Sequence, residues 1–310
     1  MEYFRRNTHW YILGTLCVAT ALIWYAVLAE DRGGKLMVAF LNIGQGDGIF
    51  VESPTGNQMM IDGGGGPIVL RELGKVMPFY DRSIDLLMVS NPDKDHMGGF
   101  LDVMHSFSIA AVVEPGTVGA SSEYRSLETM IGENPSPRPG VWVLPLRKPA
   151  RQSAGGGELP RRIIARRGQR INLGGGAYFD VLFPDRDVSG MTTNEGSIMG
   201  RLVYGNTSLM FTGDAPQNIE GYVDSLDGKN LKSDVLKVGH HGSRTSTSQE
   251  FVGYVSPTYA VISDGVANKY GHPHQETLDT LNQFGVQILR TDLSGRIVMQ
   301  SDGETISIKK

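Results

Sequence analysis

The chain has 310 residues and a formal net charge of −4, and 40% of its residues are hydrophobic. This composition is typical of a folded protein and excludes a general electrostatic attraction to nucleic acid. The single cysteine, Cys17, lies in the N-terminal apolar run, which excludes an intrachain disulfide and a thiolate metal site in the rest of the chain. Any metal ion would therefore be held by His, Asp, Glu or Asn.

The N-terminal segment is the first predicted element. Residues 10–29 carry no charge, and about twenty apolar residues are enough to span a bilayer. We predict a transmembrane helix and membrane anchor over residues 1–30, with a cleaved signal peptide as the alternative. Arg5 and Arg6 precede the segment, which predicts a cytoplasmic N-terminus and an extracytoplasmic, or secreted, domain over residues 31–310.

The remainder of the chain alternates short β-rich runs with turns and helical patterns. Hairpins are predicted around "PTGN" (54–57), around Gly205-Asn206 and at the C-terminal end. Helical patterns cover residues 100–107, 124–131 and 274–285. This mixture predicts an α/β (α+β) domain in which two mixed sheets pack face to face with helices outside.

A basic, Gly-rich insertion is predicted near residues 147–170. It holds eight of the 29 Lys and Arg residues, and its only acid is Glu158. Residues 153–160 predict a mobile loop. The insertion is interpreted either as a solvated surface segment or as a contact for an anionic polymer. The absence of aromatic residues argues against a base-stacking platform.

Five of the seven histidines fall in three polar loops, and each loop follows an apolar run. They are His96 in "NPDKDHMGG", His240 and His241 in "KVGHHGS", and His272 and His274 in "YGHPH"; Asp214 similarly ends the run "LMFTGD". Loops on one rim of a rigid scaffold are where sites are built. Asp and His ligands without Cys suit Zn²⁺ or Mn²⁺. Asp95 and His96 are adjacent, so we expect a sharp chain turn there, which Gly98 and Gly99 would permit.

At this point the motifs resemble the metallo-β-lactamase superfamily, and within it the hydrolase domain of the ComEC competence proteins. Five segments carry the resemblance in order along residues 36–305: "FLNIGQGDGIFVESPTGNQMMIDGG", "NPDKDHMGG", "NEGSIMGRLVYGNTSLMFTGD", "LKVGHHGSRTS" and "NKYGHPH". The family's multi-span channel part has no counterpart, so the resemblance implies a stand-alone hydrolase domain.

The resemblance implies an αββα sandwich with two metal sites between the sheets. The second site would use Asp95, His96, Asp214 and His241, with His240 as the alternative to His241, and Asp214 would bridge both ions. The first site would use position 91, Asp93, a residue near Asn194, and Asp214. The family has histidine at position 91, where this chain has Asn91, and the superfamily's third-loop histidine has no counterpart. The family's first motif also has Asp where this chain has Asn42.

These departures predict one tightly bound Zn²⁺ or Mn²⁺ and a second, weakly bound ion, because the first site offers amides and carboxylates only. The implied function is a metal-dependent phosphodiesterase or nuclease, in which metal-bound hydroxide attacks DNA. Asp95, His240 and His272 are the catalytic candidates, and His240 or His272 would protonate the leaving oxygen or bind phosphate. Asp47 and Asp62 are interpreted as supporting residues.

The expected partners are single-stranded DNA, the membrane through the N-terminal helix, and a DNA-uptake channel protein. Two alternatives remain open at the level of sequence. One is a hydrolase of smaller substrates such as phosphocholine esters or lactones, because pocket shape decides the substrate. The other is a non-catalytic DNA-uptake accessory module with a degraded first metal site.

Overall fold

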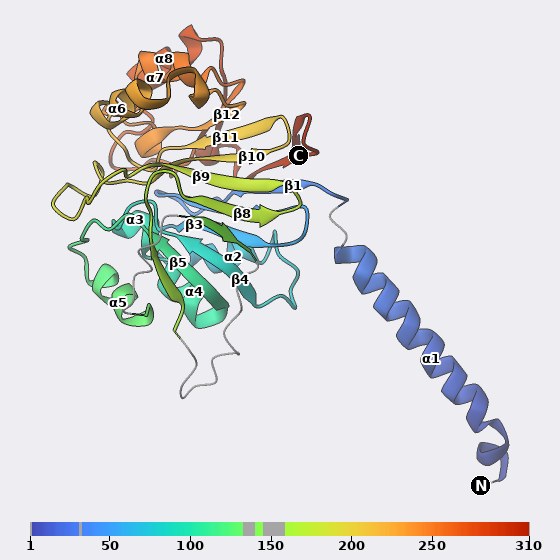
Figure 1. Cartoon of the computed structure of the whole chain (residues 1–310). Helices are drawn as coiled ribbons and strands as arrows, with labels where there is room; N and C mark the ends of the chain where they lie inside the picture. Colours follow the sequence, from blue (N-terminus) through green and yellow to red (C-terminus); the bar gives the residue numbers. More distant parts are fainter. Residues whose placement is uncertain (1, 31–32, 133–139, 145–158, 310) are drawn as a thin grey trace. The chain divides into compact units, whose positions relative to one another are not determined.

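The computed structural model describes residues 2–30, 33–132, 140–144 and 159–309. The chain divides into two units, Met1–Gly34 and Lys35–Lys310. The first unit contains helix α1 (Glu2–Glu30; Figure 1).

Helix α1 corrects one expectation. Among the described residues, no helix is both long enough and apolar enough to cross a membrane. In the stretch 8–25, polar residues such as His9, Thr15 and Thr20 interrupt the apolar run. The predicted helix forms. The prediction that it spans a membrane is wrong for the described residues. The extracytoplasmic location inferred from this segment stays a prediction.

The second unit contains two eight-stranded mixed sheets. The first sheet has the order β16-β15-β1-β2-β3-β4-β5-β7, antiparallel from β16 to β3 and parallel from β3 to β7. Its strands are β1 (Leu36–Phe40), β2 (Gly48–Glu52), β3 (Gln58–Gly63), β4 (Ser83–Met88), β5 (Ser108–Glu114), β7 (Arg161–Ile164), β15 (Ile297–Ser301) and β16 (Ile306–Lys309). Strands β2 to β5 are almost continuously buried, which their unbroken apolar runs favour.

The second sheet has the order β14-β13-β12-β11-β10-β9-β8-β6, with parallel pairing from β11 to β14. Its strands are β6 (Val141–Val143), β8 (Arg170–Gly174), β9 (Ala177–Phe183), β10 (Met199–Tyr204), β11 (Thr207–Phe211), β12 (Val235–Lys237), β13 (Tyr259–Ile262) and β14 (Gln287–Arg290). The three predicted hairpins form as β2–β3, β10–β11 and β15–β16.

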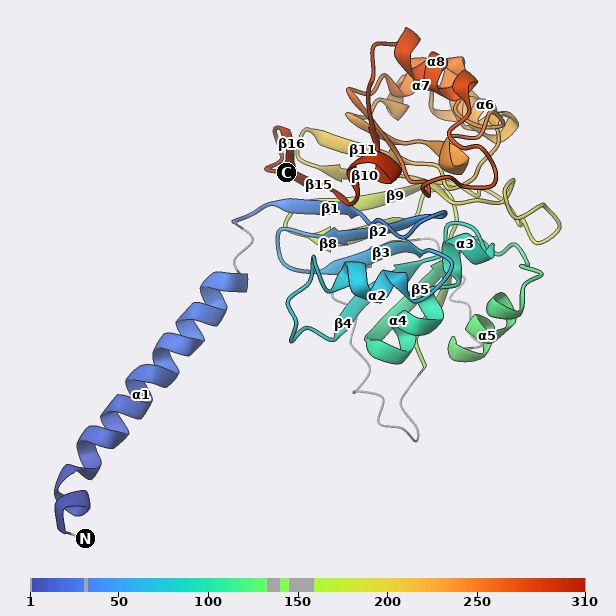
Figure 2. The ribbon, with the colours of Figure 1, turned by 180° about the vertical axis from the view of Figure 1, so that it is seen from behind.

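Helices cover the outer faces of both sheets. On the first sheet lie α2 (Ile68–Leu73), α3 (Lys94–Met97), α4 (Phe100–Ser106) and α5 (Ser122–Met130); on the second lie α6 (Gln217–Asp227), η1 (Gly228–Leu231), α7 (Gln249–Val255) and α8 (Gln275–Gln283) (Figures 1 and 2). Short turns η2 (Gly239–Gly242) and α9 (Thr291–Ser294) follow β12 and β14. One apolar core, which includes Phe40, Phe179 and Phe211, fills the space between the sheets, and a further core lies under each helical layer. The predicted αββα sandwich is confirmed.

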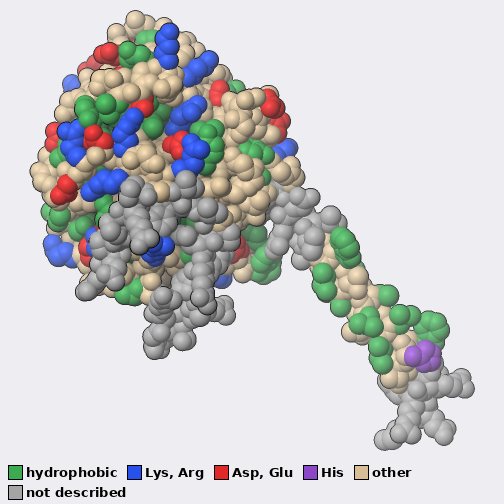
Figure 3. Space-filling view, in the orientation of Figure 1, with side chains coloured by type: hydrophobic (Ala, Val, Ile, Leu, Met, Phe, Trp, Pro, Cys, Tyr) green, Lys and Arg blue, Asp and Glu red, His purple; other side chains and the backbone are tan. Residues whose placement is uncertain are grey.

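The basic insertion is only partly described. Residues 147–158, with most of the predicted loop, lie outside the described residues. Residues 159–170, which we call the arginine segment, form β7 and lead into β8, two strands that the sequence did not predict. On the face shown in Figure 3, basic side chains of the described residues lie among acidic ones.

Arginines of this segment bind acids within the fold. Arg162 pairs with Glu114 and Glu128, Arg167 with Asp227, and Arg170 with Asp180. Arg166 donates to the carbonyl oxygens of Pro115 and Ala165. Most of these guanidinium groups are therefore already engaged, which favours a structural role for the described part of the insertion over a contact with an anionic polymer.

Candidate metal centre

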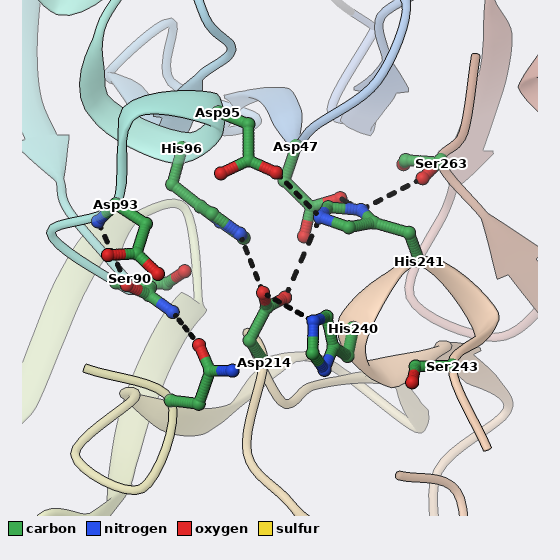
Figure 4. A network of polar contacts seen from close by, with 12 residues as sticks. Asp47, Ser90, Asp93, Asp95, His96, Asp214, His240, His241, Ser243 and Ser263 are labelled. Carbon is green, nitrogen blue, oxygen red and sulfur yellow. Dashed lines mark hydrogen bonds and ion pairs between the residues drawn. The ribbon is translucent and has the colours of Figure 1, made fainter. Parts of the chain in front are cut away.

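Polar side chains from three loops converge where the strands of both sheets end. His96 Nε2 lies 3.1 Å from Asp214 Oδ2, and His241 Nε2 lies 3.5 Å from Asp95 Oδ2 and 3.7 Å from Asp214 Oδ1 (Figure 4). Asp95 and His96 belong to α3 after β4, Asp214 follows β11, and His241 belongs to η2 after β12. The structure thus brings together the four residues expected at the second site.

Several polar atoms of this cluster are buried and have no hydrogen bond within the described part of the chain. They include Nε2 of His96, Nε2 of His241 and Oδ1 of Asp214. The exposed fractions of these three residues are 0%, 0% and 3%. A buried polar group without a partner costs about 1–3 kcal/mol, so such a group calls for an explanation. A cation among these atoms would supply their missing partner.

The ligand atoms also have the spacing that a single ion needs. Three overlapping groups each lie within 4.8 Å: Asp95, His96 and His241; Asp47, Asp62 and His96; and Asp47, Asp214 and His241. Two imidazole nitrogens and two carboxylates form a ligand set that suits Zn²⁺ or Mn²⁺. The residues present therefore fit a divalent ion, which Asp95, His96, Asp214 and His241 would hold.

An unusual backbone conformation decides which of the two adjacent histidine side chains points into the site. His240 and His241 both have positive φ, 48° and 54°, a conformation that costs free energy in any residue other than glycine and that concentrates at functional sites. The chain turn is tied down because His240 N donates to Gly213 O at 3.1 Å. As a result His241 is buried, whereas His240 is partly exposed, with Nε2 3.6 Å from Asp214 Oδ2.

Each buried histidine is held from behind through Nδ1. Asp62 Oδ2 accepts a hydrogen bond from His96 Nδ1 at 2.9 Å, and Asp62 Oδ1 accepts one from Ser90 N at 2.7 Å. The carbonyl oxygen of Ser263 accepts from His241 Nδ1 at 3.0 Å, and Asp47 Oδ1 lies 3.3 Å from the same nitrogen. Partners of this kind fix the tautomer and leave Nε2 for a metal ion.

Lys237 is a member of the site that sequence reasoning missed. Its side chain is 1% exposed, and Nζ lies 2.8 Å from Asp47 Oδ1 and donates to Val238 O at 2.9 Å. Lysine is almost never fully buried unless it is paired. The signal was available, because "DVLKV" places one lysine inside an apolar run.

The glycines next to His96 have a different role from the expected one. Gly98 and Gly99 have ordinary helical backbone, with φ of −57° and −70°, so no left-handed turn occurs there. Instead, a Cβ on Gly99 would lie 2.1 Å from Gly63 O. One turn of helix, α3, suffices to direct both Asp95 and His96 into the site. The sharp conformation lies at Gly46 (φ 121°), where a Cβ would lie 2.0 Å from Asp95 O.

The charges of the cluster stabilise one another strongly. Burial opposes ionisation of Asp214, but nearby His96 and His241 hold its pKa well below the ordinary value. Burial likewise opposes protonation of the histidines, but Asp214 and Asp62 raise the pKa of His96 well above its ordinary value, and Asp214 and Asp47 raise that of His241 to about 9. A metal ion that binds these nitrogens must therefore displace protons.

The family follows from these residues and their order. The model of the Metallo-beta-lactamase superfamily matches residues 41–263, which include every residue of the cluster. The chain belongs to this superfamily. Among solved structures, CmlA, a diiron beta-hydroxylase from Streptomyces venezuelae, is 13% identical with a TM-score of 0.50, covering 86% of this chain and 54% of that chain. This likeness supports the metallo-beta-lactamase fold alone.

Curated relatives of this metallo-beta-lactamase domain include a competence protein. ComE operon protein 3 of Bacillus subtilis (strain 168) is 28% identical over 304 residues, 92% of this chain and 35% of that protein. Competence protein ComA of Neisseria gonorrhoeae is 41% identical over 122 residues, 39% of this chain and 18% of that protein. The chain thus spans about a third of the first relative and less of the second.

The remaining histidine loop lies at the mouth of the metallo-beta-lactamase centre. The ring of His272 lies 5.7 Å from that of His240 and 6.4 Å from that of His241, and it stacks on Tyr270 at 5.6 Å. Burial and the nearby histidines lower the pKa of His272 to about 4. His274 is turned aside, since its Nδ1 accepts from Arg244 N at 3.1 Å.

Apart from Asp214, the residues expected at the first site form a separate group. Asn91 Nδ2 donates to Asn194 Oδ1 at 2.8 Å, and Thr193 Oγ1 donates to Asp93 Oδ2 at 3.0 Å. Among the described residues, no group of His and carboxylate ligands with the spacing of a metal site includes Asp93. The two expected sites therefore differ in how their polar atoms are satisfied.

Proposed function

We propose that this domain is a metal-dependent phosphodiesterase that cleaves DNA, with single-stranded DNA as the expected substrate. The observation that carries the hydrolase part is the set of buried ligand atoms on His96, His241 and Asp214 that converge without hydrogen bonds among the described residues. A degraded, purely structural centre would be expected to fill these positions with hydrogen bonds or apolar groups, because unpartnered buried atoms are costly. The non-catalytic alternative is therefore disfavoured.

The choice of DNA rests on the relatives. One curated relative is named as a competence protein, and another, ComE operon protein 3, aligns with 92% of this chain. The proposal includes a channel-forming partner in DNA uptake, since the chain corresponds to about a third of ComE operon protein 3. The arginine segment adds no support for DNA binding, because its described arginines are largely engaged within the fold.

The position of each residue in the site suggests its role in the reaction. A divalent ion held by Asp95, His96, Asp214 and His241 would act as a Lewis acid and would lower the pKa of a bound water. Asp95, whose side chain is 36% exposed, faces the solvent side of the cluster, where it can orient water by accepting a hydrogen bond. His240, with Nδ1 3.2 Å from Thr245 Oγ1, is held at the mouth, where it can contact a phosphate oxygen.

His272 is the second group at the mouth. Its Nδ1 is buried and has no hydrogen-bond partner within the described part of the chain. A neutral imidazole at this position could accept a proton from the attacking water and deliver it to the leaving oxygen. Asp95, His240 and His272 thus remain the proposed catalytic residues.

The test is a cleavage assay on the full chain with Mn²⁺, Mg²⁺ and Zn²⁺ in parallel. We expect metal-dependent cleavage of single-stranded DNA that is lost in Asp214→Ala and retained in Asp279→Ala, an exposed aspartate on α8. Cleavage of a generic phosphodiester but not of DNA would contradict the DNA assignment and favour the small-substrate hydrolase. Salt-sensitive DNA binding without turnover in any metal would contradict the enzyme.

A further inference from the structure

Asn91 stands where the resemblance places a histidine ligand, and its side chain is 0% exposed. Both of its polar groups have partners inside the protein. Nδ2 donates to Asn194 Oδ1 at 2.8 Å, and Oδ1 accepts from Asp93 N at 2.9 Å. An amide coordinates a metal ion through its oxygen. Here the oxygens of both asparagines already accept hydrogen bonds.

The loop that carries Asn194 closes the position further. Thr193 Oγ1 donates to Asp93 Oδ2 at 3.0 Å, and Ile198 N donates to Ser90 O at 2.8 Å. These bonds join the loop after β4 to the loop before β10 on both sides of the amide pair. The Asn91–Asn194 pair is thus part of a hydrogen-bonded seam between the two sheets, and a metal ion could enter only by breaking it.

In the second site, by contrast, candidate ligand atoms of the described residues do not bond one another with hydrogen bonds. Nε2 of His96, Nε2 of His241 and Oδ1 of Asp214 are buried without hydrogen bonds, among the described residues. Both sites lie in the same chain and adjoin Asp214, so their difference reflects the side chains that line them. Unsatisfied ligand atoms indicate a position for an ion, whereas mutually satisfied ones indicate a position that is closed.

We propose that the centre holds a single divalent ion, at the second site, and that the Asn91–Asn194 amide pair closes the first site. The inference rests on the metal centre of the proposed function and replaces the expectation of a weakly bound second ion. Asp214 would then bind the one ion together with Asp95, His96 and His241, and it would not bridge two ions.

The test counts metal ions on the full chain, independently of activity. Native mass spectrometry and calorimetric titration with Mn²⁺ and with Zn²⁺ should give one equivalent at saturation. The electron paramagnetic resonance spectrum of the Mn²⁺-loaded protein should be that of an isolated ion, without coupling to a second. Two bound equivalents or a coupled pair would overturn the inference, and no bound ion would overturn it together with the metal centre. One equivalent without DNA cleavage would leave the inference standing and contradict only the proposed function.

A pair of variants separates the amide pair from the ion's ligands. Asn194→Ala removes the acceptor of Asn91 Nδ2 and should leave the count at one, with the ion affinity within about threefold of wild type. Asn206→Ala, an asparagine that donates to Glu304 on a distant hairpin, is the matched control. The double variant Asn91→His with Asn194→His should open the site and raise the count toward two. A tenfold or larger loss of ion affinity in Asn194→Ala would overturn the inference, because Asn194 would then be a ligand.

Discussion

The second site and the arginine segment both contain many charged side chains, but they differ in whether the polar atoms of these side chains make hydrogen bonds within the protein. In the second site, ligand atoms of His96, His241 and Asp214 are buried and make no hydrogen bond among the described residues. In the arginine segment, Arg162 binds both Glu114 and Glu128, and Arg167 binds Asp227 through two nitrogens. The comparison teaches that missing partners, rather than charge density, distinguish a binding site from a structural cluster.

The largest expected effect comes from removal of a ligand. His96→Ala should lower the affinity for Mn²⁺ or Zn²⁺ by more than about 100-fold, because loss of a mere outer partner already costs about 10–100-fold. The measurement is calorimetric titration. His105→Ala is the matched control, since His105 is exposed on α4 and bonds only Leu101 O in the described structure. Equal affinities in both variants would contradict the assignment of His96.

A substitution of Lys237 tests the residues that support the candidate metal ligands. Lys237→Met leaves Asp47 buried without its cation and loosens the support of His241, so ion affinity should fall by about 10–100-fold. The free energy of unfolding should also fall, by about 3–5 kcal/mol, because a buried charge loses its partner. Lys237→Arg should recover part of both losses. Lys232→Met, at an exposed position, is the control, and an unchanged ion affinity in Lys237→Met would remove Lys237 from the site.

The arginine segment should respond in stability alone. Arg162→Ala leaves buried Glu114 without its partner, so the free energy of unfolding should fall by about 2–4 kcal/mol. Metal affinity should stay within about twofold of wild type. Arg170→Ala removes an exposed pair with Asp180 and should cost less than about 1 kcal/mol. Denaturant unfolding measures the stability of both variants. A loss of metal binding in Arg162→Ala would contradict a purely structural role for the arginine segment.

The sequence predicted the convergence of polar residues well where apolar runs end in them. Asp95, His96 and Asp214 each follow a buried strand, and strands of both sheets end on the same rim, so their convergence could be inferred. The inward direction of His241 could not, because it depends on two successive positive φ angles. The closure of the first site was also hidden, since Asn91 meets Asn194 across 103 positions of sequence.

The arginine segment shows the converse failure. Strand β7 reads "RRII" and lies at the edge of its sheet, where Arg162 can reach Glu114 on the neighbouring strand. From sequence, its charges predicted an insertion and hid the strand. The acids that pair with these arginines lie in other parts of the chain, so only the fold could show that the charges are internal.

Asp224 sharpens the comparison. It is 4% exposed, and neither carboxylate oxygen has a hydrogen-bond partner among the described residues. No metal-ligand group of the described structure includes it, so a proton takes the place of an ion. Burial, with a further contribution from Glu250, raises its pKa to about 7. A missing partner therefore marks a metal site only where other ligands converge.

The sign of the pH effect follows from the raised pKa. The folded state holds the proton of Asp224 more tightly than the unfolded state, so the stabilisation is complete below about pH 4 and is lost as the pH rises through 7. Asp224→Asn removes this loss. Relative to wild type, the variant should gain on the order of 3 kcal/mol in unfolding free energy between pH 4.5 and pH 8. Asp279→Asn, at an exposed position of α8, should show no such gain. Parallel pH profiles for wild type and Asp224→Asn would mean that Asp224 is ionised in the folded protein, and that its unpaired oxygens have a partner after all.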